Sequence, residues 1–170
     1  MAIRTILVYP DARLRERAEP VEAVDDSIRE LIEDMAETMY AAPGVGLAAN
    51  QIGVLKRVFV IDIADENEPS DLKVFINPEI LEATGTQTYQ EGCLSFPDAS
   101  EEIKRAGRVR VRALDAQGQP FELEAEGLLA VAIQHENDHL NGVLMIDKLG
   151  PIKRRRLGQK LKKARGEARA

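Results

Sequence analysis

Cysteine, histidine and long apolar runs are scarce in this sequence of 170 residues, which has one cysteine and two histidines. A single cysteine cannot form an intramolecular disulfide, so the cross-linked framework of small secreted proteins is excluded. The best apolar run, residues 127–133, is much shorter than the roughly 18 residues of a membrane span. The N-terminus lacks the apolar length and the cleavage site of a signal peptide. We therefore expect a soluble protein of the reducing cytoplasm.

Length and composition fit one globular domain. Of the residues, 44% are hydrophobic and 31% are charged, which suffices for one core and leaves no room for a second full domain. The net charge of −6 is uneven, because residues 151–170 carry +8 and residues 1–150 carry −14. We expect a main body at 1–150 and a basic tail at 151–170 of the same domain, and the charge of the tail indicates a binding partner.

Apolar residues at helical spacing predict two helices in the main body. The first begins at Asp25 or Asp26, either of which suits an N-cap, and ends before Pro43. The second covers residues 126–141, with Gly142 near its C-cap. A third helix is expected in the basic tail, where one apolar stripe contains Leu157, Leu161, Ala164 and Ala168.

Strand-type segments fall between the two main-body helices. They are predicted at residues 57–63, 72–81, 103–115 and 121–125, and the last two are joined across residues 116–119. Strands grouped between helices are typical of the α+β class. We expect a single compact domain of mixed or antiparallel β-sheets packed around a central helix at residues 126–141, with an N-terminal and a C-terminal helix.

The central helix contains Gln134-His-Glu-Asn-Asp-His139. A spacing of four places His135 and His139 on one face, one turn apart, so both imidazoles can bind one ion. Glu136 can reach water on that ion without being a ligand, which is the general-base position of HExxH hydrolases. Since such strings also occur by chance on solvated helices, the metal interpretation requires a further ligand.

Cys93 is the candidate for that ligand. It lies in residues 90–97, where Gly92 lets the backbone turn and Pro97 ends any regular element, so we expect it on a bulge or loop. A buried structural cysteine is the alternative. With the histidine pair present, one thiolate and two imidazoles form a set that leaves a fourth position for water.

A third motif, residues 42–51, contains Gly44, Gly46 and Gln51. It lacks the Gly-Lys-Ser/Thr of a nucleotide loop, so phosphate binding is rejected. The glycines leave room for an extended peptide, and Gln51 offers an amide donor. The alternative is a simple connection between a helix and a strand.

Together the three motifs resemble those of the peptide deformylase family, Gly-x-Gly-Leu-Ala-Ala-x-Gln, Glu-Gly-Cys-Leu-Ser and Gln-His-Glu-x-Asp-His. They stand here at residues 44–51, 91–95 and 134–139, with every defined position matched. The resemblance implies removal of the formyl group from the N-terminal formyl-methionine of new polypeptides. It further implies a metal-bound hydroxide as nucleophile, with Glu136 as general acid/base.

The same resemblance assigns roles to individual residues. Cys93, His135 and His139 are expected to hold one divalent ion, which is Fe²⁺ by resemblance, with Zn²⁺, Ni²⁺ or Co²⁺ as alternatives. Gln51 and the backbone N–H of Leu94 are expected to stabilise the oxyanion. The residues expected around the substrate are Gly44, Val45, Gly46, Glu91, Gly92, Leu128 and Val131. Asp138 is expected either to pair with Arg105 behind the ligands or to form a surface ion pair.

The basic tail and two competing functions complete the expectations. The tail is predicted either to contact ribosomal RNA or to be a solvated helix face. An HExxH endopeptidase would need a ligand downstream of His139, and Asp147 is left open for that role. A non-catalytic, metal-stabilised nucleic-acid-binding protein would need a fourth protein ligand, and the sequence has no further Cys or His.

Overall fold

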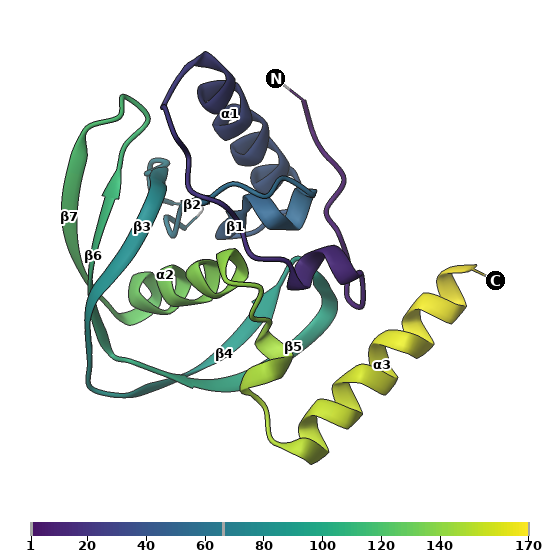
Figure 1. Cartoon of the computed structure of the whole chain (residues 1–170). Helices are drawn as coiled ribbons and strands as arrows, with labels where there is room; N and C mark the ends of the chain where they lie inside the picture. The colour runs from purple at the N-terminus through teal and green to yellow at the C-terminus, as the bar shows by residue number, and fades with distance from the viewer. Residues whose placement is uncertain (1, 66, 170) are drawn as a thin grey trace.

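The structure, a computed structural model, describes residues 2–65 and 67–169, with side chains except those of residues 98 and 161–169. Figure 1 shows two β-sheets and three helices, α1 (Asp26–Ala41), α2 (Gly127–Leu140) and α3 (Pro151–Arg169), of which α2 is central. The larger sheet has the strand order β1-β2-β3-β6-β7, and the smaller one pairs β4 with β5. All of these pairings are antiparallel. The predicted α+β class is confirmed.

The strands of the two sheets lie around the helix that carries both histidines. They are β1 (Gly46–Ala48), β2 (Val58–Ile61), β3 (Lys73–Thr84), β4 (Gln87–Cys93), β5 (Phe96–Arg105), β6 (Arg108–Leu114) and β7 (Pro120–Glu126). Helix α2 packs against β1, β2, β6 and β7 and lies near the centre of the molecule (Figure 1). The predicted packing of sheets around a central helix is confirmed.

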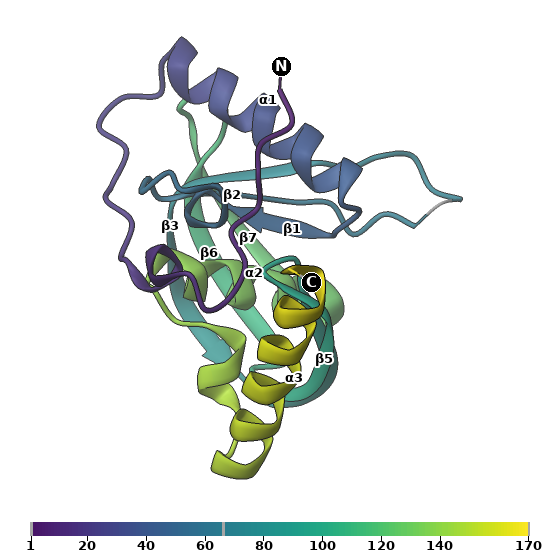
Figure 2. The ribbon, with the colours of Figure 1, turned by 90° about the vertical axis from the view of Figure 1, so that its right-hand side faces the viewer.

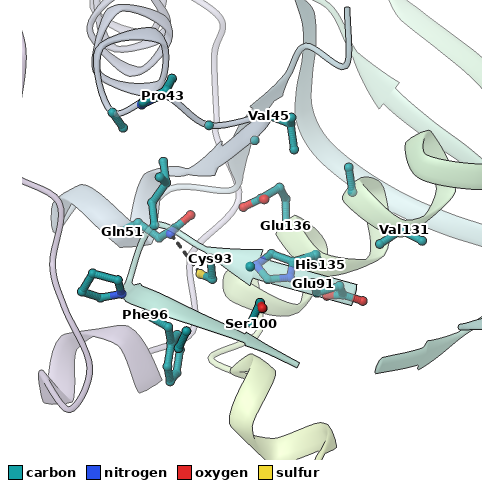
Figure 3. Close-up of a pocket in the computed structure, with 18 of the residues that line it drawn as sticks. Pro43, Val45, Gln51, Glu91, Cys93, Phe96, Ser100, Val131, His135 and Glu136 are labelled. Atoms are coloured by element: carbon teal, nitrogen blue, oxygen red, sulfur yellow. Dashed lines mark hydrogen bonds and ion pairs between the residues drawn. The ribbon is translucent and has the colours of Figure 1, made fainter. Parts of the chain in front are cut away.

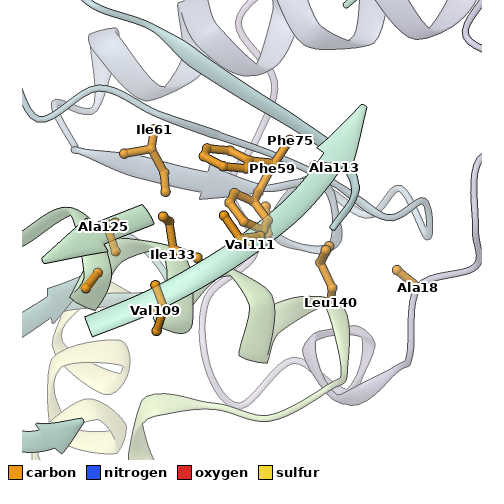
Figure 4. Close-up of a cluster of buried hydrophobic side chains, with 13 residues drawn as sticks. Ala18, Phe59, Ile61, Phe75, Val109, Val111, Ala113, Ala125, Ile133 and Leu140 are labelled. Atoms are coloured by element: carbon orange, nitrogen blue, oxygen red, sulfur yellow. The ribbon is translucent and has the colours of Figure 1, made fainter. Parts of the chain in front are cut away.

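Strand β2 is buried on both faces because it lies between α1 and α2. Phe59 and Ile61 belong to the cluster that contains the apolar face of α2, whereas Val58 and Val60 belong to the cluster under α1. This division follows the alternation of side chains along a strand. The ring of Phe59 stacks on Phe75 with centroids 4.7 Å apart, beside Ile133 of α2 (Figure 4).

Both main-body helices have well-defined ends. The N-cap of α1 is Asp25, whose carboxylate accepts a hydrogen bond from the N–H of Ile28 at 3.1 Å. Helix α2 ends in a Schellman motif: the N–H of Gly142 bonds to the carbonyl of His139 and that of Val143 to the carbonyl of Asp138. Gly142 has φ +74°, as this position requires.

One strand prediction was wrong, and one hairpin was missed. The segment 103–115 is not a single strand, because the chain turns at residues 106–107 between β5 and β6. Strand β5 instead begins at Phe96 and pairs with β4 through a two-residue turn, since Cys93 is opposite Phe96. The register shifts between Gly92 and Cys93, so the bulge expected at Cys93 is present at the end of a strand.

The basic tail is helical, as predicted. Figure 2 shows α3 in front of β5, and α3 also packs on the 3-10 helix η3 (Met145–Lys148). Leu157 is buried, while the predicted stripe positions Leu161, Ala164 and Ala168 lie outside the described side chains. Among the described residues, no helix combines the length and the apolar character that crossing a bilayer requires.

Candidate functional site

Cys93, His135 and His139 converge at the junction of the two sheets. Helix α2 presents both imidazoles on one face, and the end of β4 brings the sulfur to them. The Sγ of Cys93 lies 3.3 Å from Nε2 of His139, which lies 3.2 Å from Nε2 of His135. The ligand atoms of the three residues all lie within 4.8 Å of one another. One thiolate and two imidazoles at this separation match a catalytic metal site with an open position.

The electrostatics of this group favour a cation. Burial lowers the pKa of His135, but the Cys93 sulfur, Glu136 and Glu91 outweigh it and hold that pKa well above its ordinary value. Burial and then the charge of His135 hold the pKa of His139 well below its ordinary value. The site therefore favours one positive charge beside the sulfur and disfavours a second, and one thiolate with two imidazoles is a donor set that suits a single divalent ion. The residues present fit a metal ion.

Glu91 and Arg105 support the first histidine from behind. Nδ1 of His135 lies 2.9 Å from Oε1 of Glu91, and the guanidinium of Arg105 donates to both Glu91 oxygens at 2.6 and 3.0 Å. Burial raises the pKa of Glu91, but the hydrogen bonds from His135 and Arg105 outweigh it and lower that pKa. Glu91 is thus a carboxylate that fixes the ring of His135.

Arg105 extends this support to the next turn of α2. Its guanidinium also donates to Asp138 at 2.8 Å, and its side chain is only 4% exposed. The expected pair between Asp138 and Arg105 is formed, and it is not a surface ion pair. Bidentate bonding to Glu91 together with this third bond makes Arg105 the link between β4 and α2.

Glu136 lies beside the metal group with unused hydrogen-bonding capacity. Its side chain is buried, and within the described residues its Oε1 has no hydrogen-bond partner. Burial raises the pKa of Glu136 to about 7. A carboxyl group that titrates near neutral pH is suited to taking up and returning a proton.

Gln51 reaches the group from the 3-10 helix η2 (Ala49–Ile52). Its Oε1 accepts a hydrogen bond from the N–H of Ala48 at 2.9 Å, so its Nε2 faces the opposite side. That nitrogen donates to Oγ of Ser95 at 3.1 Å and lies 3.7 Å from Sγ of Cys93. The amide donor expected at Gln51 is therefore directed toward the metal group (Figure 3).

A cavity of about 880 Å³ opens in front of these residues. Figure 3 shows the cavity with Val45 and Val131 near Glu136 and with Gln51 near Cys93. All of the residues expected around the substrate line it, namely Gly44, Val45, Gly46, Glu91, Gly92, Leu128 and Val131. It is also lined by Gln51, Cys93, Leu94, His135 and Glu136. The three sequence motifs therefore meet at one cavity.

Several residues of the site were missed by the sequence reasoning. The cavity is also lined by Ile6, Tyr89, Ala99, Ser100 and Ala132, and by Ala42, Pro43, Phe96 and Pro97, which lie in the predicted motifs but were given no role in the site. Pairing across a predicted β4–β5 hairpin would have brought Ser100 opposite Gly92, but that hairpin was not predicted. The support of His135 by Glu91 carries no local sequence signal, since the two are 44 residues apart.

Asp147, the ligand left open for an endopeptidase, lies elsewhere. It bonds to Arg15 at 2.6 Å, to Arg154 at 2.8 Å and to the N–H of Leu144. It does not belong to the group of metal-binding side chains found among the described residues. Asp147 is therefore not the third metal ligand, downstream of His139, that an endopeptidase would need.

Comparison with known proteins gives consistent matches over nearly the whole chain. The model of the polypeptide deformylase family matches residues 3–155. A peptide deformylase of Azotobacter vinelandii is 60% identical over 165 residues, which are 96% of each chain. The crystal structure of a peptide deformylase from Legionella pneumophila has a TM-score of 0.92 at 51% identity, covering 99% of both chains. A peptide deformylase of Ehrlichia chaffeensis in complex with actinonin has a TM-score of 0.91 at 41% identity, covering 96% of this chain and 98% of that one.

Proposed function

Because this chain belongs to the peptide deformylase family, whose members are metal-dependent hydrolases that remove the formyl group from nascent peptides, we propose a role for each residue of its site. Cys93, His135 and His139 hold one divalent ion. The convergence of their ligand atoms within 4.8 Å is the observation that carries the proposal. The ion is Fe²⁺ in the cell, and Zn²⁺, Ni²⁺ or Co²⁺ can replace it. When bound, it supplies a Lewis acid that polarises the formyl carbonyl and makes water acidic near neutral pH.

Glu136 moves the proton. Its Oε1, which has no partner among the described residues, accepts a proton from the attacking water. The oxygen of that water forms a bond to the formyl carbon, and the bond from this carbon to the methionine nitrogen then breaks. Glu136 returns the proton to the leaving nitrogen, so that formate and a free amine result. Burial keeps the carboxyl group near the pKa that both transfers require.

Gln51 and Leu94 stabilise the developing negative charge. The carboxamide N–H of Gln51 and the backbone N–H of Leu94 donate to the oxygen of the former formyl carbonyl. Both residues line the cavity beside Cys93, and donors placed in advance need not reorganise during the reaction. Loss of one such donor typically lowers kcat about 100- to 1,000-fold.

The substrate binds as an added strand. Gly46 at the start of β1 and Gly92 near the end of β4 offer backbone groups to the peptide, and Gly44 leaves space beside it. The methionine side chain lies against Val45, Leu128 and Val131, which line the same cavity. Glu91 forms part of the wall while its carboxylate orients His135.

Formate release tests the proposed function. Metal-loaded protein is expected to release formate from formyl-Met-Ala-Ser, and Glu136→Ala is expected to lower kcat about 100- to 10,000-fold. Glu101→Ala is the matched control, because Glu101 lies on β5 outside the cavity. An inactive wild-type protein with each of the four metals would refute the function, and a fully active Glu136→Ala variant would refute its assigned role.

The main body and the tail have separate tasks in this proposal. Residues 1–150 form the catalytic body, and residues 151–170 form a basic helical tail of the same domain that contacts the ribosome. The exposed side chains of Lys153, Arg155, Arg156 and Lys160 support this contact, because Lys and Arg bind phosphate backbones by releasing counterions. An enzyme that acts on nascent chains works where translation occurs, so its compartment is the cytoplasm.

Neutralising the tail tests the ribosome contact more cleanly than deleting it. Deletion of residues 151–170 would also remove Leu157, which is buried, and Arg154, which bonds to Asp147. Changing Lys153, Arg155, Arg156 and Lys160 to Gln keeps both anchors. The variant is expected to bind ribosomes more weakly, with a smaller salt dependence, and to keep its activity on short formyl peptides. An unchanged affinity for ribosomes would refute the proposed contact of the tail.

A further inference from the structure

The carboxamide of Gln51 is held at both ends inside the protein. Its Oε1 accepts from the backbone N–H of Ala48 at 2.9 Å, which fixes which atom is the oxygen. Its Nε2 donates to the hydroxyl oxygen of Ser95 at 3.1 Å. Gln51 is 1% exposed and Ser95 is 0% exposed, so water does not replace either partner.

Ser95 occupies the two-residue turn between β4 and β5, next to Leu94. This turn follows the metal-binding residue Cys93 directly. A hydroxyl at this position therefore ties Gln51 to the backbone that carries both the sulfur and the N–H of Leu94. The two proposed oxyanion donors come from segments more than 40 residues apart, and the bond from Gln51 to Ser95, at 3.1 Å, is shorter than the one from Gln51 to Cys93, at 3.7 Å.

A single extended segment holds the backbones of both partners. The N–H of Leu7 donates to the carbonyl of Gln51 at 2.7 Å, and the N–H of Tyr9 donates to the carbonyl of Ser95 at 2.9 Å. Residues two apart on an extended chain face the same side. The ring of Tyr9 also stacks on Phe96, with centroids 5.0 Å apart. Gln51 and Ser95 are therefore fixed relative to each other at the backbone as well as through their side chains.

The geometry points to Ser95 as a positioning residue for the hydrolysis: its hydroxyl sets the plane of the Gln51 carboxamide, so that the second N–H faces the oxygen of the formyl group. An amide nitrogen has two hydrogens in one plane. With one bonded to Ser95, the other is directed to the side on which Cys93 lies, 3.7 Å from the nitrogen. This inference rests on the proposed role of Gln51 as an oxyanion donor and adds the residue that aims it.

Loss of the Ser95 hydroxyl leaves the carboxamide of Gln51 with the hydrogen bond from Ala48 and a long one of 3.7 Å to the sulfur of Cys93, which is a weak acceptor. The carboxamide can then turn about its terminal bond, and the donor N–H no longer has a fixed direction. A donor that must reorganise during the reaction stabilises charge less than one placed in advance. Substrate binding does not use this donor, so the effect falls on kcat rather than on KM.

A double-mutant cycle on metal-loaded protein tests the inference. The variants are Ser95→Ala, Gln51→Ala and the combination of both, with kcat and KM measured by formate release from formyl-Met-Ala-Ser. Ser95→Ala is expected to lower kcat about 10- to 100-fold, less than the loss of the whole donor, with KM changed less than about twofold. In the Gln51→Ala background it is expected to cause no further loss, because nothing remains to be positioned.

The outcomes separate this inference from the proposed function. If Gln51→Ala is fully active, the oxyanion role of Gln51 fails and the role of Ser95 fails with it. If Gln51→Ala is impaired but Ser95→Ala is not, or if Ser95→Ala costs the same factor in both backgrounds, only the role of Ser95 is overturned. A loss of bound metal in Ser95→Ala overturns it as well, because a merely structural role would explain the result.

Two further variants guard against misfolding. Ser95→Gly removes the hydroxyl and can adopt the backbone conformation of the turn, and it replaces Ser95→Ala in the cycle if that variant does not fold. Ser95→Thr keeps the hydroxyl and is expected to retain kcat within about threefold. A Ser95→Thr variant that is folded and metal-loaded but as slow as Ser95→Ala would contradict the role of the hydroxyl.

Discussion

A β-carbon added to Gly46 would lie 2.6 Å from Oε2 of Glu136. Strand β1 therefore approaches α2 so closely that the carboxylate fills the space a side chain would need. The same glycine lines the cavity that we propose as the substrate site. Glycine at this position lets the backbone of β1 and the carboxylate of Glu136 lie side by side in the wall of the cavity.

Gly46→Ala is expected to lower kcat about 10- to 100-fold, because Glu136 must move away from its place beside the metal group. General acid/base catalysis typically contributes about 100- to 10,000-fold, and a displaced carboxylate keeps part of it. The free energy of unfolding is expected to change little, since the atom that must yield is the end of a side chain. Formate release and thermal denaturation measure the two effects.

Gly150→Ala is the matched control for that substitution. A β-carbon at Gly150 would meet nothing within 4 Å, and the residue lies in the connection before α3. It is expected to keep wild-type kcat. Equal activity of Gly46→Ala and Gly150→Ala would show that the position of Glu136 is not restricted by β1.

Glu91→Gln is expected to weaken metal binding about 10- to 100-fold, the usual cost of losing a group that orients a metal ligand. The amide keeps the shape of the side chain but removes the charge that faces His135 and Arg105. Competition with a coloured zinc chelator measures the affinity. Glu101→Gln is the control, because Glu101 lies opposite Glu91 on β5 and undergoes the same chemical change. Equal metal affinities for the two variants would show that Glu91 does not support metal binding through His135.

The sequence could single out Cys93, His135 and His139, whose ligand atoms the structure brings together, because each lies in a short motif. His135 and His139 are brought together by one helical turn, and the buried faces of α1 and α2 follow from helical periodicity. The contact of Cys93 with these rings depends on the β4–β5 hairpin, which periodicity alone did not reveal. Cys93 was instead linked to the histidines because a catalytic ion needs a third protein ligand and the sequence has one cysteine, and the resemblance to a family implied the same set.

The hairpin was missed because its residues do not alternate cleanly between apolar and polar. Strand β4 exposes Thr88, Tyr89 and Gln90 in succession, and its buried residue is the charged Glu91. A buried carboxylate is expected in a sequence only if its partner is known, and Arg105 lies on the other strand of the hairpin. The merged prediction for 103–115 failed because Ile103, near the end of β5, was joined with Val109 and Val111 of β6 across the turn that contains Gly107.

Asp147→Asn is expected to make the Tm fall less steeply as the pH is lowered. Burial raises the pKa of Asp147, but hydrogen bonds from Arg15, Leu144 and Arg154 outweigh it and hold that pKa below its ordinary value of 3.8. A lowered pKa in the folded state stabilises the fold above about pH 4, and this contribution is lost as the pH falls through the folded value. Between about pH 5 and pH 2 the Tm of the wild type is therefore expected to fall more steeply than that of Asp147→Asn.

The control for the acid experiment is Asp71→Asn. The carboxylate of Asp71 pairs with Lys73 at the surface and is 70% exposed, and exposed pairs contribute little to stability. Its curve of Tm against pH is expected to match that of the wild type. Parallel curves for the wild type and Asp147→Asn would mean that the junction of η3, α3 and the N-terminal segment carries none of the acid sensitivity.

Gly142→Ala is expected to destabilise the fold more than Gly118→Ala. Both glycines have positive φ, +74° and +78°, so alanine costs about 1–2 kcal/mol at either position. At Gly142 the new β-carbon would also clash with the backbone carbonyl of Arg15, whereas at Gly118 it would meet Val24 at an ordinary 3.5 Å. A backbone group cannot move aside as the end of a side chain can, so the difference in the free energy of unfolding should isolate the clash. Gly142 follows the end of α2, the helix that carries both histidines. Equal losses of stability in the two variants would show that the close packing of this end of α2 on Arg15 does not contribute to stability.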